Sequence, residues 1–354
     1  MKVTLATDAG SPGGVGRHLT DLARGLRRLD AEVTFAAPAG SAIERTAAEF
    51  GSWFVPFEHG VEPADVFHLH LANTYDRRSV AVLARARRRA RRVVVTEHLP
   101  RSNASDPGLT VDRRTLGAYT AKTCFKRLQL GLADSVIAVS RESRHFLLSR
   151  YGLNPDRVRT ILNGVDIGHF APGPARVRGR GGVPSVLAVG SLIWQKGHDV
   201  LIRAAGLARR DWTVVIAGAG PQHAALARLA DLLAPGRVRF LGWHEDVPAL
   251  MREATVVCMP SRWESFAYVP VEAMALGRPV VASRVDGVNE YICHGSNGLL
   301  VEPDDPAGLA AAIERLLGNP TRAAELAWAG RRDVGRLSVD RMVEQTYIHY
   351  RSLR

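Results

Sequence analysis

The chain has 354 residues, of which 46% are hydrophobic and 23% charged, and this balance excludes a disordered tail or a fibrous repeat. Its length exceeds what one small core needs and predicts two domains. Basic residues outnumber acidic ones by 47 to 35, and 43 of the 47 are arginine. The net charge, +8 over residues 1–170 and +4 over the remainder, favours an anionic partner: a nucleotide phosphate, an acidic lipid headgroup or nucleic acid.

Cysteine usage and the lengths of apolar runs indicate the compartment. The three cysteines, Cys124, Cys258 and Cys293, include no Cys-x-x-Cys pair and suggest no disulfide framework. Residues 1–7 lack the long apolar core of a signal peptide, and no segment approaches the roughly 20 apolar residues of a membrane span. We therefore expect a cytoplasmic protein.

The first half of the chain alternates short apolar runs with amphipathic stretches. Strands are predicted at residues 3–6, 33–36, 66–70, 93–96 and 136–139. Helices are predicted at residues 17–28, 79–92 and 141–151. This alternation predicts a parallel sheet with helices on both faces.

A second α/β unit follows a break in the pattern. Residues 171–184, APGPARVRGRGGVP, have neither helical nor strand periodicity, and we interpret them as a linker between domains of residues 1–170 and 185–335. After the linker, a helix is predicted at residues 197–209 and strands at residues 185–189, 213–217, 238–241, 256–259 and 280–282. Parallel α/β sheets bind ligands outside the carboxyl ends of their strands. We therefore expect the chemistry in loops after strands, at a cleft between the two domains.

A glycine cluster follows the first predicted strand. Gly10, Gly13, Gly14 and Gly16 allow a close backbone approach, and the helix that follows presents free N–H groups to an anion. Their spacing is not Gly-x-Gly-x-x-Gly, so the dinucleotide fingerprint is absent. A purely structural tight turn is the alternative.

A second strand-loop-helix junction, VGSLIWQKG at residues 189–197, places Lys196 at the entrance of a helix. The helix dipole disfavours a cation there unless an anion lies between them, which points to a phosphate. The alternative is a solvated surface lysine, although lysine is scarce in this chain.

The third cluster, PSRWESFAYVPVEAMA at residues 260–275, carries two carboxylates. Pro270 is tolerated only in the first turn of a helix, so a helix is predicted to start at residues 267–269 with its N–H groups unpaired. Glu264 then lies in the loop before the helix and Glu272 within it, on the order of 10 Å apart. That separation suits two ends of one extended ligand with an anionic centre at the helix start. The alternative is a helix-terminal charge and an exposed helix residue.

These motifs together resemble a known family. The stretch of residues 256–302, with Glu264 and Glu272 followed by AMALGRPVVAS, resembles the donor site of retaining nucleotide-sugar transferases of glycosyltransferase family 4, which have the GT-B fold. SPGGVGRH, TEH at residues 96–98, DSVIAVS, LNGVD, IAGAGP and FLGWHEDVPALM extend the resemblance over nearly the whole chain. It implies an α/β fold of two Rossmann-like domains facing across a cleft. The N-terminal domain would bind the acceptor, and residues 336–354 would cross back onto it as a helix.

The resemblance also implies a role for individual residues. Glu264 would bind hydroxyls of the donor sugar, Glu272 the nucleotide ribose, and Lys196 the diphosphate. His98 would approach the sugar near the reacting centre, so the implied catalytic residues are His98, Glu264 and Lys196. The implied donor site comprises Gly14, Gly16, Gly190, Ser191, Lys196, Gly218, Trp243, His244, Glu264, Ser265, Phe266, Ala267, Tyr268 and Glu272.

No cofactor or metal is expected, because backbone N–H groups and a lysine can stabilise a departing nucleoside diphosphate and the sequence has no Asp-x-Asp motif. Two departures from the family pattern concern the diphosphate. Ser191 stands where an arginine is usual, and we expect either that Arg17, Arg203 or Arg262 substitutes or that the donor binds more weakly. Ala267 stands where the family has glycine, which adds a Cβ where the backbone approaches phosphate.

Acceptor contacts are expected from residues 99–115, because such loops vary within a fold. Glu97, Asp106 and Asp112 are candidates, the aspartates for an amine-bearing acceptor such as an aminocyclitol; lipid-linked, polysaccharide and small thiol-precursor acceptors are alternatives. Residues 85–92 hold six arginines, which suit either a membrane patch or a solvated helix face. Nucleic acid is disfavoured, because no recognised binding motif accompanies the charge.

We therefore expect a glycosyltransferase that moves a sugar from a nucleoside diphosphate sugar, with UDP the expected nucleotide, to a small-molecule or glycan acceptor hydroxyl with retention. Bacterial natural-product or cell-envelope glycosides are the expected products. The alternatives are a transferase at the membrane face acting on a lipid-linked acceptor, and a non-catalytic nucleotide-sugar-binding protein. A nicotinamide oxidoreductase is disfavoured because Gly218-Ala-Gly220 lacks the third glycine of the fingerprint.

Overall fold

The computed structural model describes the chain except residues 11–12, 58–60, 73–74, 99–112, 172–181 and 354, together with the side chains of residues 113–119. The chain forms two compact units: an N-terminal unit of Met1–Gly164 and Val339–Arg354, and a second unit of Val165–Ser338. The chain leaves the N-terminal unit at residue 164 rather than at the predicted 170, and returns at residue 339 rather than 336. At this junction Val165 and Ser338 form a parallel bridge, and the Val165 N–H donates to the Leu337 carbonyl at 2.8 Å.

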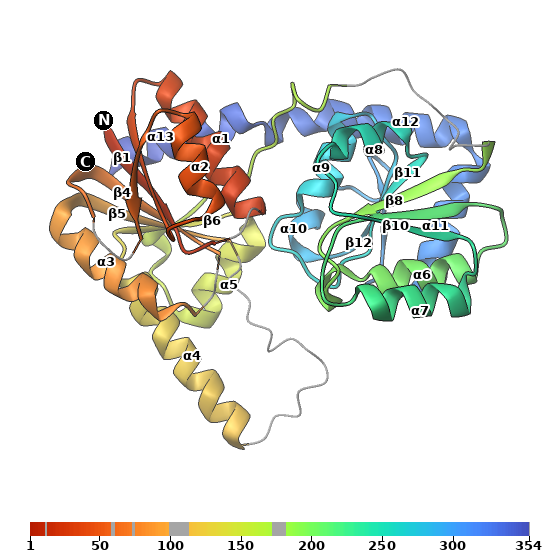
Figure 1. Cartoon of the computed structure of the whole chain (residues 1–354), viewed down its shortest axis with the longest axis horizontal. Helices are drawn as coiled ribbons and strands as arrows, with labels where there is room; N and C mark the ends of the chain where they lie inside the picture. The colour runs from red at the N-terminus through yellow and green to blue at the C-terminus, as the bar shows by residue number, and fades with distance from the viewer. Residues whose placement is uncertain (11–12, 58–60, 73–74, 99–112, 172–181, 354) are drawn as a thin grey trace. The chain divides into compact units, whose positions relative to one another are not determined.

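The N-terminal unit is a seven-stranded, all-parallel sheet in the order β3-β2-β1-β4-β5-β6-β7 (Figure 1). The strands are β1 (Lys2–Thr7), β2 (Glu32–Ala37), β3 (Trp53–Pro56), β4 (Ala64–Leu71), β5 (Ala90–Glu97), β6 (Ser135–Ala138) and β7 (Val158–Thr160). The helices are α1 (Gly14–Arg28), α2 (Ala42–Glu49), α3 (Arg77–Arg89), α4 (Arg113–Gly131), α5 (Arg141–Tyr151) and α13 (Val339–Ser352).

Apolar side chains on both faces of this sheet form two cores. One core joins Leu5 and Phe35 to apolar residues of α1 and α13, and the other joins Phe67 and Val95 to those of α3, α4 and α5. The helix predicted for residues 79–92 ends at Arg89, because β5 begins at Ala90 and pairs with β4 from Ala64 onward. The predicted strands are confirmed to within a few residues, and the crossing-back of the C-terminal helix is seen in the packing of α13 on α1.

The second unit is a six-stranded, all-parallel sheet in the order β10-β9-β8-β11-β12-β13. The strands are β8 (Ser185–Val189), β9 (Thr213–Ala217), β10 (Val238–Gly242), β11 (Val256–Met259), β12 (Val280–Ser283) and β13 (Leu299–Val301). The helices are α6 (His198–Gly206), α7 (His223–Leu233), α8 (Val247–Glu253), α9 (Tyr268–Ala275), α10 (Asp286–Asn289), α11 (Pro306–Gly318) and α12 (Pro320–Asp333).

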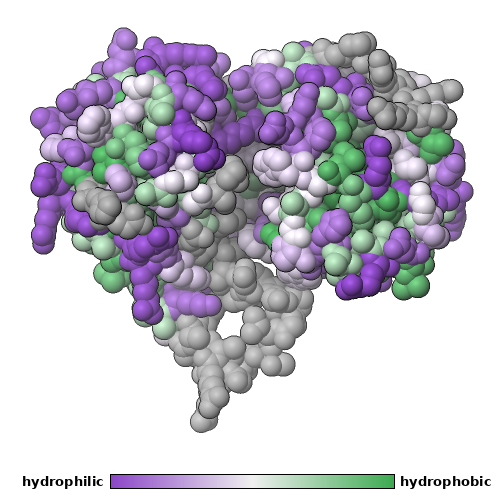
Figure 2. Space-filling view, in the orientation of Figure 1, coloured by the Kyte–Doolittle hydropathy of each residue, from purple (hydrophilic) through white to green (hydrophobic). Residues whose placement is uncertain are grey.

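The core of the second unit joins alternate residues of the strands, such as Val186 and Ile216, to apolar residues of α6, α7 and α11. Most of residues 171–184, which we predicted as a linker, lie outside the described residues. Across the described part of the chain, no helix is both long and apolar enough to span a bilayer. Figure 2 shows hydrophilic side chains over much of the visible face of the N-terminal unit.

Candidate active site

Both sheets reverse their strand order once, and the predicted residues Gly14, Lys196 and Glu264 lie in segments that follow strands at these reversals. In the second unit the reversal lies between β8 and β11, and in the N-terminal unit it lies between β1 and β4. Loops that leave such a pair of strands run to opposite sides of the sheet and open a crevice at its carboxyl edge. Gly190–Gly197 follows β8 and residues 260–267 follow β11, so sequence segments about 70 residues apart meet there.

A lysine and a buried glutamate form the centre of this arrangement in the second unit. Lys196 Nζ lies 2.6 Å from Glu264 Oε1, and the Ser261 hydroxyl donates to the same oxygen at 2.8 Å. Glu264 is only 8% exposed, whereas the Lys196 side chain keeps 28% of its surface in solvent. The carboxylate is therefore held by two donors, while the ammonium group can still meet a ligand. Ser261 was missed in the sequence because serine in a loop carries no distinctive signal.

Arg262 is engaged within the second unit. Its guanidinium makes two hydrogen bonds to the Asp199 carboxylate, at 2.9 and 2.8 Å, and an ion pair with Asp304 at 2.7 Å. It also lies over the Trp194 ring, 4.7 Å from the centroid. Burial alone would raise the pKa of Asp199, but the hydrogen bonds and charge of Arg262 outweigh burial and lower it. Arg262 therefore holds the loop that carries Lys196 in place. Because its guanidinium is already paired with Asp199 and Asp304, nothing supports the expectation that it replaces the arginine that the family has at the position of Ser191, an exposed residue here.

Glycines bring the loops of this site to backbone contact. Gly218 has φ of +155°, and a Cβ there would lie 1.9 Å from the Gly190 carbonyl oxygen. Gly197 has φ of +63°, and a Cβ there would lie 2.0 Å from the Pro260 carbonyl oxygen. No side chain fits at either position, because the nearest neighbours are backbone atoms, which cannot move aside as a flexible side chain could. The implied donor residues Gly190 and Gly218 thus determine how closely the loops after β8 and β9 approach.

The predicted helix start is confirmed, because α9 begins at Tyr268 with Ala267 as its N-cap. No side chain caps this helix, whereas aspartate or asparagine side chains cap α8, α11 and α12 of the same unit. Ser265, Phe266 and Ala267 are buried in the loop that leads into α9. Glu272 is 4% exposed, so the alternative of an exposed helix residue is wrong. The start of α9 therefore has no side-chain cap and has a buried carboxylate on each side in the sequence, Glu264 before it and Glu272 within it.

Other implied donor residues occupy the turn after β10. Gly242 has φ of +69°, and the Gly218 N–H donates to its carbonyl at 2.8 Å. Trp243 is 67% exposed and His244 is also exposed. An exposed indole beside the glycine loops is available to stack on a planar ring.

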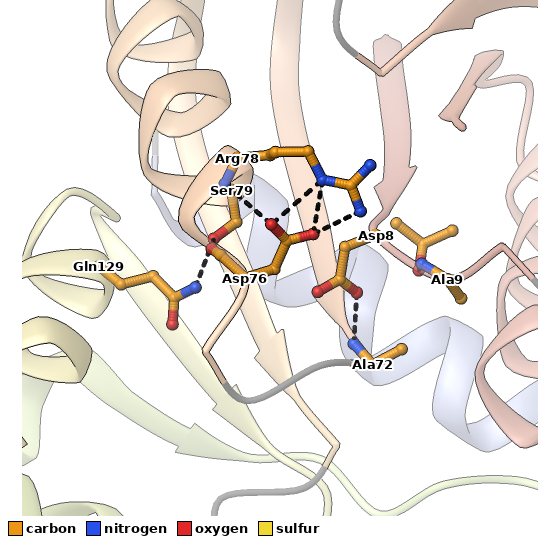
Figure 3. Close-up of polar contacts among 8 residues, drawn as sticks. Asp8, Ala9, Ala72, Asp76, Arg78, Ser79 and Gln129 are labelled. Carbon is orange, nitrogen blue, oxygen red and sulfur yellow. Dashed lines mark hydrogen bonds and ion pairs between the residues drawn. The ribbon is translucent and has the colours of Figure 1, made fainter. Parts of the chain in front are cut away.

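In the N-terminal unit, Gly14 is the first residue of α1, which has no side-chain cap and no acidic residue in its first turn. Gly16 is buried, and a Cβ there would touch Ile43 at 3.7 Å. Asp8, directly after β1, is 2% exposed and accepts a hydrogen bond from the Ala72 N–H at 2.7 Å (Figure 3). Asp8 thereby ties the loop after β1 to the loop after β4 at the strand-order reversal.

His98, at the end of β5, lies in a cluster of buried histidines that the sequence did not predict. Its Nε2 is 3.2 Å from His70 Nδ1, and its ring centroid is 4.8 Å from that of His18 on α1. Burial, with the charges of neighbouring histidines, lowers the pKa of His98 and of His70 well below the usual value. Burial lowers the pKa of His18 to about 4, partly offset by Asn163. All three rings are therefore neutral at pH 7. The signal that was overlooked is the alternation His68-Leu-His70 on a buried strand.

Among the described residues, His18, His70 and His98 are the potential metal ligands that lie together, with one nitrogen from each within 4.8 Å of the others. A tetrahedral zinc site with Zn–N bonds of about 2.05 Å needs nitrogens only about 3.3 Å apart. The cluster would have to contract to hold zinc.

Glu97 and His98 lie on opposite faces of the sheet, as strand alternation predicts. Glu97 is fully buried and forms an ion pair with the fully buried Lys126 of α4. An acceptor would have to displace Lys126 to reach this carboxylate. The other acceptor candidates, Asp106 and Asp112, lie outside the described residues.

Comparison with known proteins places the chain in a family. Residues 183–319 match the family described as Glycosyl transferases group 1, and residues 12–169 match Glycosyltransferase Family 4. The D-inositol 3-phosphate glycosyltransferase of Frankia alni is 32% identical over 90% of this chain and 89% of that protein. The chain belongs to glycosyltransferase family 4.

A second relative matches part of this chain, and a solved structure matches nearly all of it. The D-inositol 3-phosphate glycosyltransferase of Salinispora tropica is 38% identical over 60% of this chain, and the matched stretch spans about half, 49%, of that relative. The crystal structure of HepE from Anabaena in complex with UDP-glucose has a TM-score of 0.82, with 23% identity over 99% of this chain and 100% of that one. The predicted GT-B class, with two Rossmann-like sheets, is thereby confirmed for this family 4 glycosyltransferase.

Proposed function

We propose that the protein transfers a sugar from a UDP-sugar to an acceptor hydroxyl, with retention of anomeric configuration. One observation carries the proposal. At the strand-order reversal of the second unit, the Lys196–Glu264 pair adjoins the start of α9, which no side chain caps, so a cation, a carboxylate and a helix N-terminus lie close together. A diphosphate joined to a sugar requires these groups, because its phosphates take the cation and the N–H donors while its hydroxyls donate to a carboxylate. The UDP-glucose complex of HepE supports UDP as the nucleotide.

In this proposal the roles of individual residues are those that the family resemblance implies. Lys196 and the N–H groups of Phe266, Ala267 and Tyr268 bind the diphosphate, with the start of α1 at Gly14 as a second source of N–H donors. Glu264 accepts from sugar hydroxyls, and the buried Glu272 accepts from the ribose. The exposed Trp243 stacks on the base, and His98 donates to the sugar near the reacting carbon.

The proposed chemistry is an exchange of oxygens at the anomeric carbon. The bond from that carbon to the phosphate oxygen breaks, the acceptor oxygen bonds on the same face, and the acceptor proton passes to the departing phosphate oxygen. Negative charge then builds up on UDP, where Lys196 and the N–H groups of α9 stabilise it without needing to reorganise. We propose that no metal is required, because these donors already neutralise the leaving group.

The experiment is a donor panel of UDP-, GDP- and ADP-sugars, measured by calorimetry and by release of free nucleotide. Binding of a UDP-sugar with slow hydrolysis is expected, and Glu264→Gln should reduce hydrolysis at least tenfold, since one charge-assisted hydrogen bond contributes about 1.5–3 kcal/mol. Glu253→Gln, an exposed carboxylate at the end of α8, is the matched control and should change nothing. Binding of a nicotinamide dinucleotide and of no nucleotide sugar would refute the proposal. Binding without hydrolysis or transfer on any acceptor would favour a non-catalytic binder.

For the acceptor, we propose a cyclitol bearing an amine, bound by Asp106 and Asp112. The curated relatives named for D-inositol 3-phosphate support a cyclitol. Replacing both aspartates by asparagine should raise the acceptor KM and leave UDP affinity unchanged. Unchanged kinetics on an aminocyclitol would refute this assignment.

The arginines of residues 85–92 supply the test of the membrane-face alternative. All six are exposed; Arg87 pairs with Asp134 at 3.4 Å, Arg91 with Asp65 at 3.7 Å, and Arg92 donates to the Leu353 carbonyl. The other three make no polar contact with described residues. Co-sedimentation with vesicles containing phosphatidylglycerol, lost when these three become glutamine, would favour a lipid-linked acceptor, and recovery in the supernatant would favour a solvated face.

A further inference from the structure

The buried histidines of the N-terminal unit lie on one face of the sheet. His68 and His70 alternate along β4, and the register pairs His70 with Thr96 of β5, so His98, two residues farther on, shares their face. His18 reaches them from α1, and Tyr350 reaches them from α13, at the far end of the chain. The ring centroids of His68 and His70 are 4.0 Å apart, and those of His70 and His98 are 5.5 Å apart.

His68 shows what a purely structural histidine looks like here. Its Nδ1 is 2.5 Å from the Tyr350 hydroxyl, and its Nε2 is 2.7 Å from the Thr96 hydroxyl. Both nitrogens are satisfied, as expected for a side chain that is 1% exposed.

His70 is different. It is fully buried, its Nδ1 bonds to His98 Nε2 at 3.2 Å, and its Nε2 has no hydrogen-bond partner among the described residues. A buried polar atom without a partner is costly, and an apolar ring at this position would avoid that cost. The bond to His98 is therefore the interaction that explains a histidine at this position.

The two neutral rings share one proton in this bond, which leaves two arrangements. If His98 donates from Nε2, then His70 carries its own proton on Nε2, and a buried N–H has no acceptor. If His70 donates from Nδ1, its Nε2 is a bare lone pair, and His98 carries its proton on Nδ1. Orphaned buried N–H groups are rarer than unsatisfied acceptors, so the second arrangement is favoured.

We infer that His70 is a positioning residue, which holds His98 as the neutral tautomer protonated on Nδ1 and so makes it a hydrogen-bond donor toward the sugar. This inference rests on the proposed function for the identity of the ligand. His98 is 7% exposed and makes no other hydrogen bond in the described part of the chain, so its Nδ1 is available to a ligand oxygen. A neutral donor suits a sugar hydroxyl or ring oxygen, and it neither removes the acceptor proton nor adds a charge.

The C-terminal helix, α13, contributes a side chain to this cluster of histidines. Tyr350 is fully buried and bonds to His68, whose ring lies against His70. Helix α13 reaches this depth because α1 has Gly25 at the crossing, where a Cβ would lie 2.4 Å from a Val343 methyl group. The bond between Tyr350 and His68 thus joins residues 282 positions apart in the sequence.

The test reads the tautomer directly, by long-range ¹H–¹⁵N NMR of the full-length protein with labelled histidine. His98, assigned through His98→Gln, is expected to be protonated on Nδ1. His70→Asn keeps an amide N–H donor near the Nδ1 position and should preserve this state. His70→Phe removes the donor and should shift His98 toward protonation on Nε2. His68→Asn is the matched control, because it is equally buried on the same strand but does not contact His98.

Activity gives the second readout. His70→Phe should lower kcat by about tenfold, the effect of one lost hydrogen bond, with little change in donor KM, and His70→Asn should recover most of it. Protonation of wild-type His98 on Nε2, or an unchanged tautomer in His70→Phe, would overturn the inference. Because the NMR readout needs no turnover, it separates this failure from that of the proposed function, which would appear as no binding of any nucleotide sugar by the wild-type protein.

Discussion

Replacing Lys196 by methionine separates two roles that the Lys196–Glu264 pair combines. Methionine keeps the length of the side chain and removes the charge. In the free protein, Glu264 then loses the contact with Lys196 at 2.6 Å and keeps the hydrogen bond from the Ser261 hydroxyl at 2.8 Å. In the complex with UDP, the diphosphate loses the one cation that the second unit is proposed to supply.

The magnitudes follow from burial. A charge-assisted hydrogen bond contributes about 1.5–3 kcal/mol. Because Lys196 is 28% exposed and is shared with Glu264, we take about 2 kcal/mol, which corresponds to about 30-fold weaker UDP binding. Leaving the Glu264 carboxylate, 7% exposed, without its cation should lower the free energy of unfolding by about 2 kcal/mol, less than for a fully buried pair because water reaches the lysine site.

The double variant Lys196→Met/Glu264→Gln distinguishes the two roles. It has no unpaired carboxylate, so urea unfolding should return to within about 1 kcal/mol of the wild type, while UDP affinity measured by calorimetry stays low. Lys2→Met is the matched control, because Lys2 and Glu32 form an exposed pair, 64% and 66% exposed, at 3.5 Å. Recovery of UDP affinity in the double variant would refute the reasoning, since it would mean that the lysine acts only by neutralising Glu264.

Further predictions concern the glycines of the second unit, the buried histidines of the N-terminal unit and the need for a metal. Gly218→Ala should lower the free energy of unfolding by at least about 2 kcal/mol, because its Cβ meets a backbone oxygen, whereas Gly242→Ala, with open space around it, should cost about 1 kcal/mol, as measured by urea titration. Tyr350→Phe leaves His68 Nδ1 unpartnered and should cost about 1–2 kcal/mol in the same assay. EDTA should leave UDP affinity and donor hydrolysis unchanged, and a loss reversed by a divalent cation would contradict a metal-free site. The buried histidines have pKa values below 6.5 in the folded protein, with the pKa of His18 at about 4, so the protein takes up protons when it unfolds below pH 6.5. The free energy of unfolding should therefore fall between pH 7.5 and pH 4.5. A free energy of unfolding that does not change over this range would contradict the burial of these rings in the neutral form.

The sequence by itself determined the class of fold and the positions of Lys196 and Glu264 at junctions between strands and helices. Buried strands of a parallel sheet are continuous apolar runs, so residues 185–189, 213–217 and 256–259 were predicted to the residue. The start of α9 was predictable because proline tolerates only the first turn of a helix. Lys196 and Glu264 were identified by their places at two strand-helix junctions, a local feature.

Only the tertiary structure decided which of these groups touch. The contact between Lys196 and Glu264 depends on strand order, which places β8 beside β11, and no local pattern contains that order. The engagement of Arg262 by Asp199 and Asp304 was likewise invisible, because any of several arginines suited a diphosphate on charge alone. Charge is a property of a residue, whereas its availability depends on neighbours that come from distant segments.

The histidines show this limit most clearly. Sequence and resemblance singled out His98, and strand alternation correctly turned Glu97 to the other face, toward Lys126. That His98 bonds to His70, and that Tyr350 from the last helix supports His68 beside it, follows from the register of β4 with β5 and from the packing of α13 on α1. Periodicity shows which face of an element is buried, because it reflects the geometry of that element alone. Which side chains meet on that face is decided by packing between elements, and that requires the whole fold.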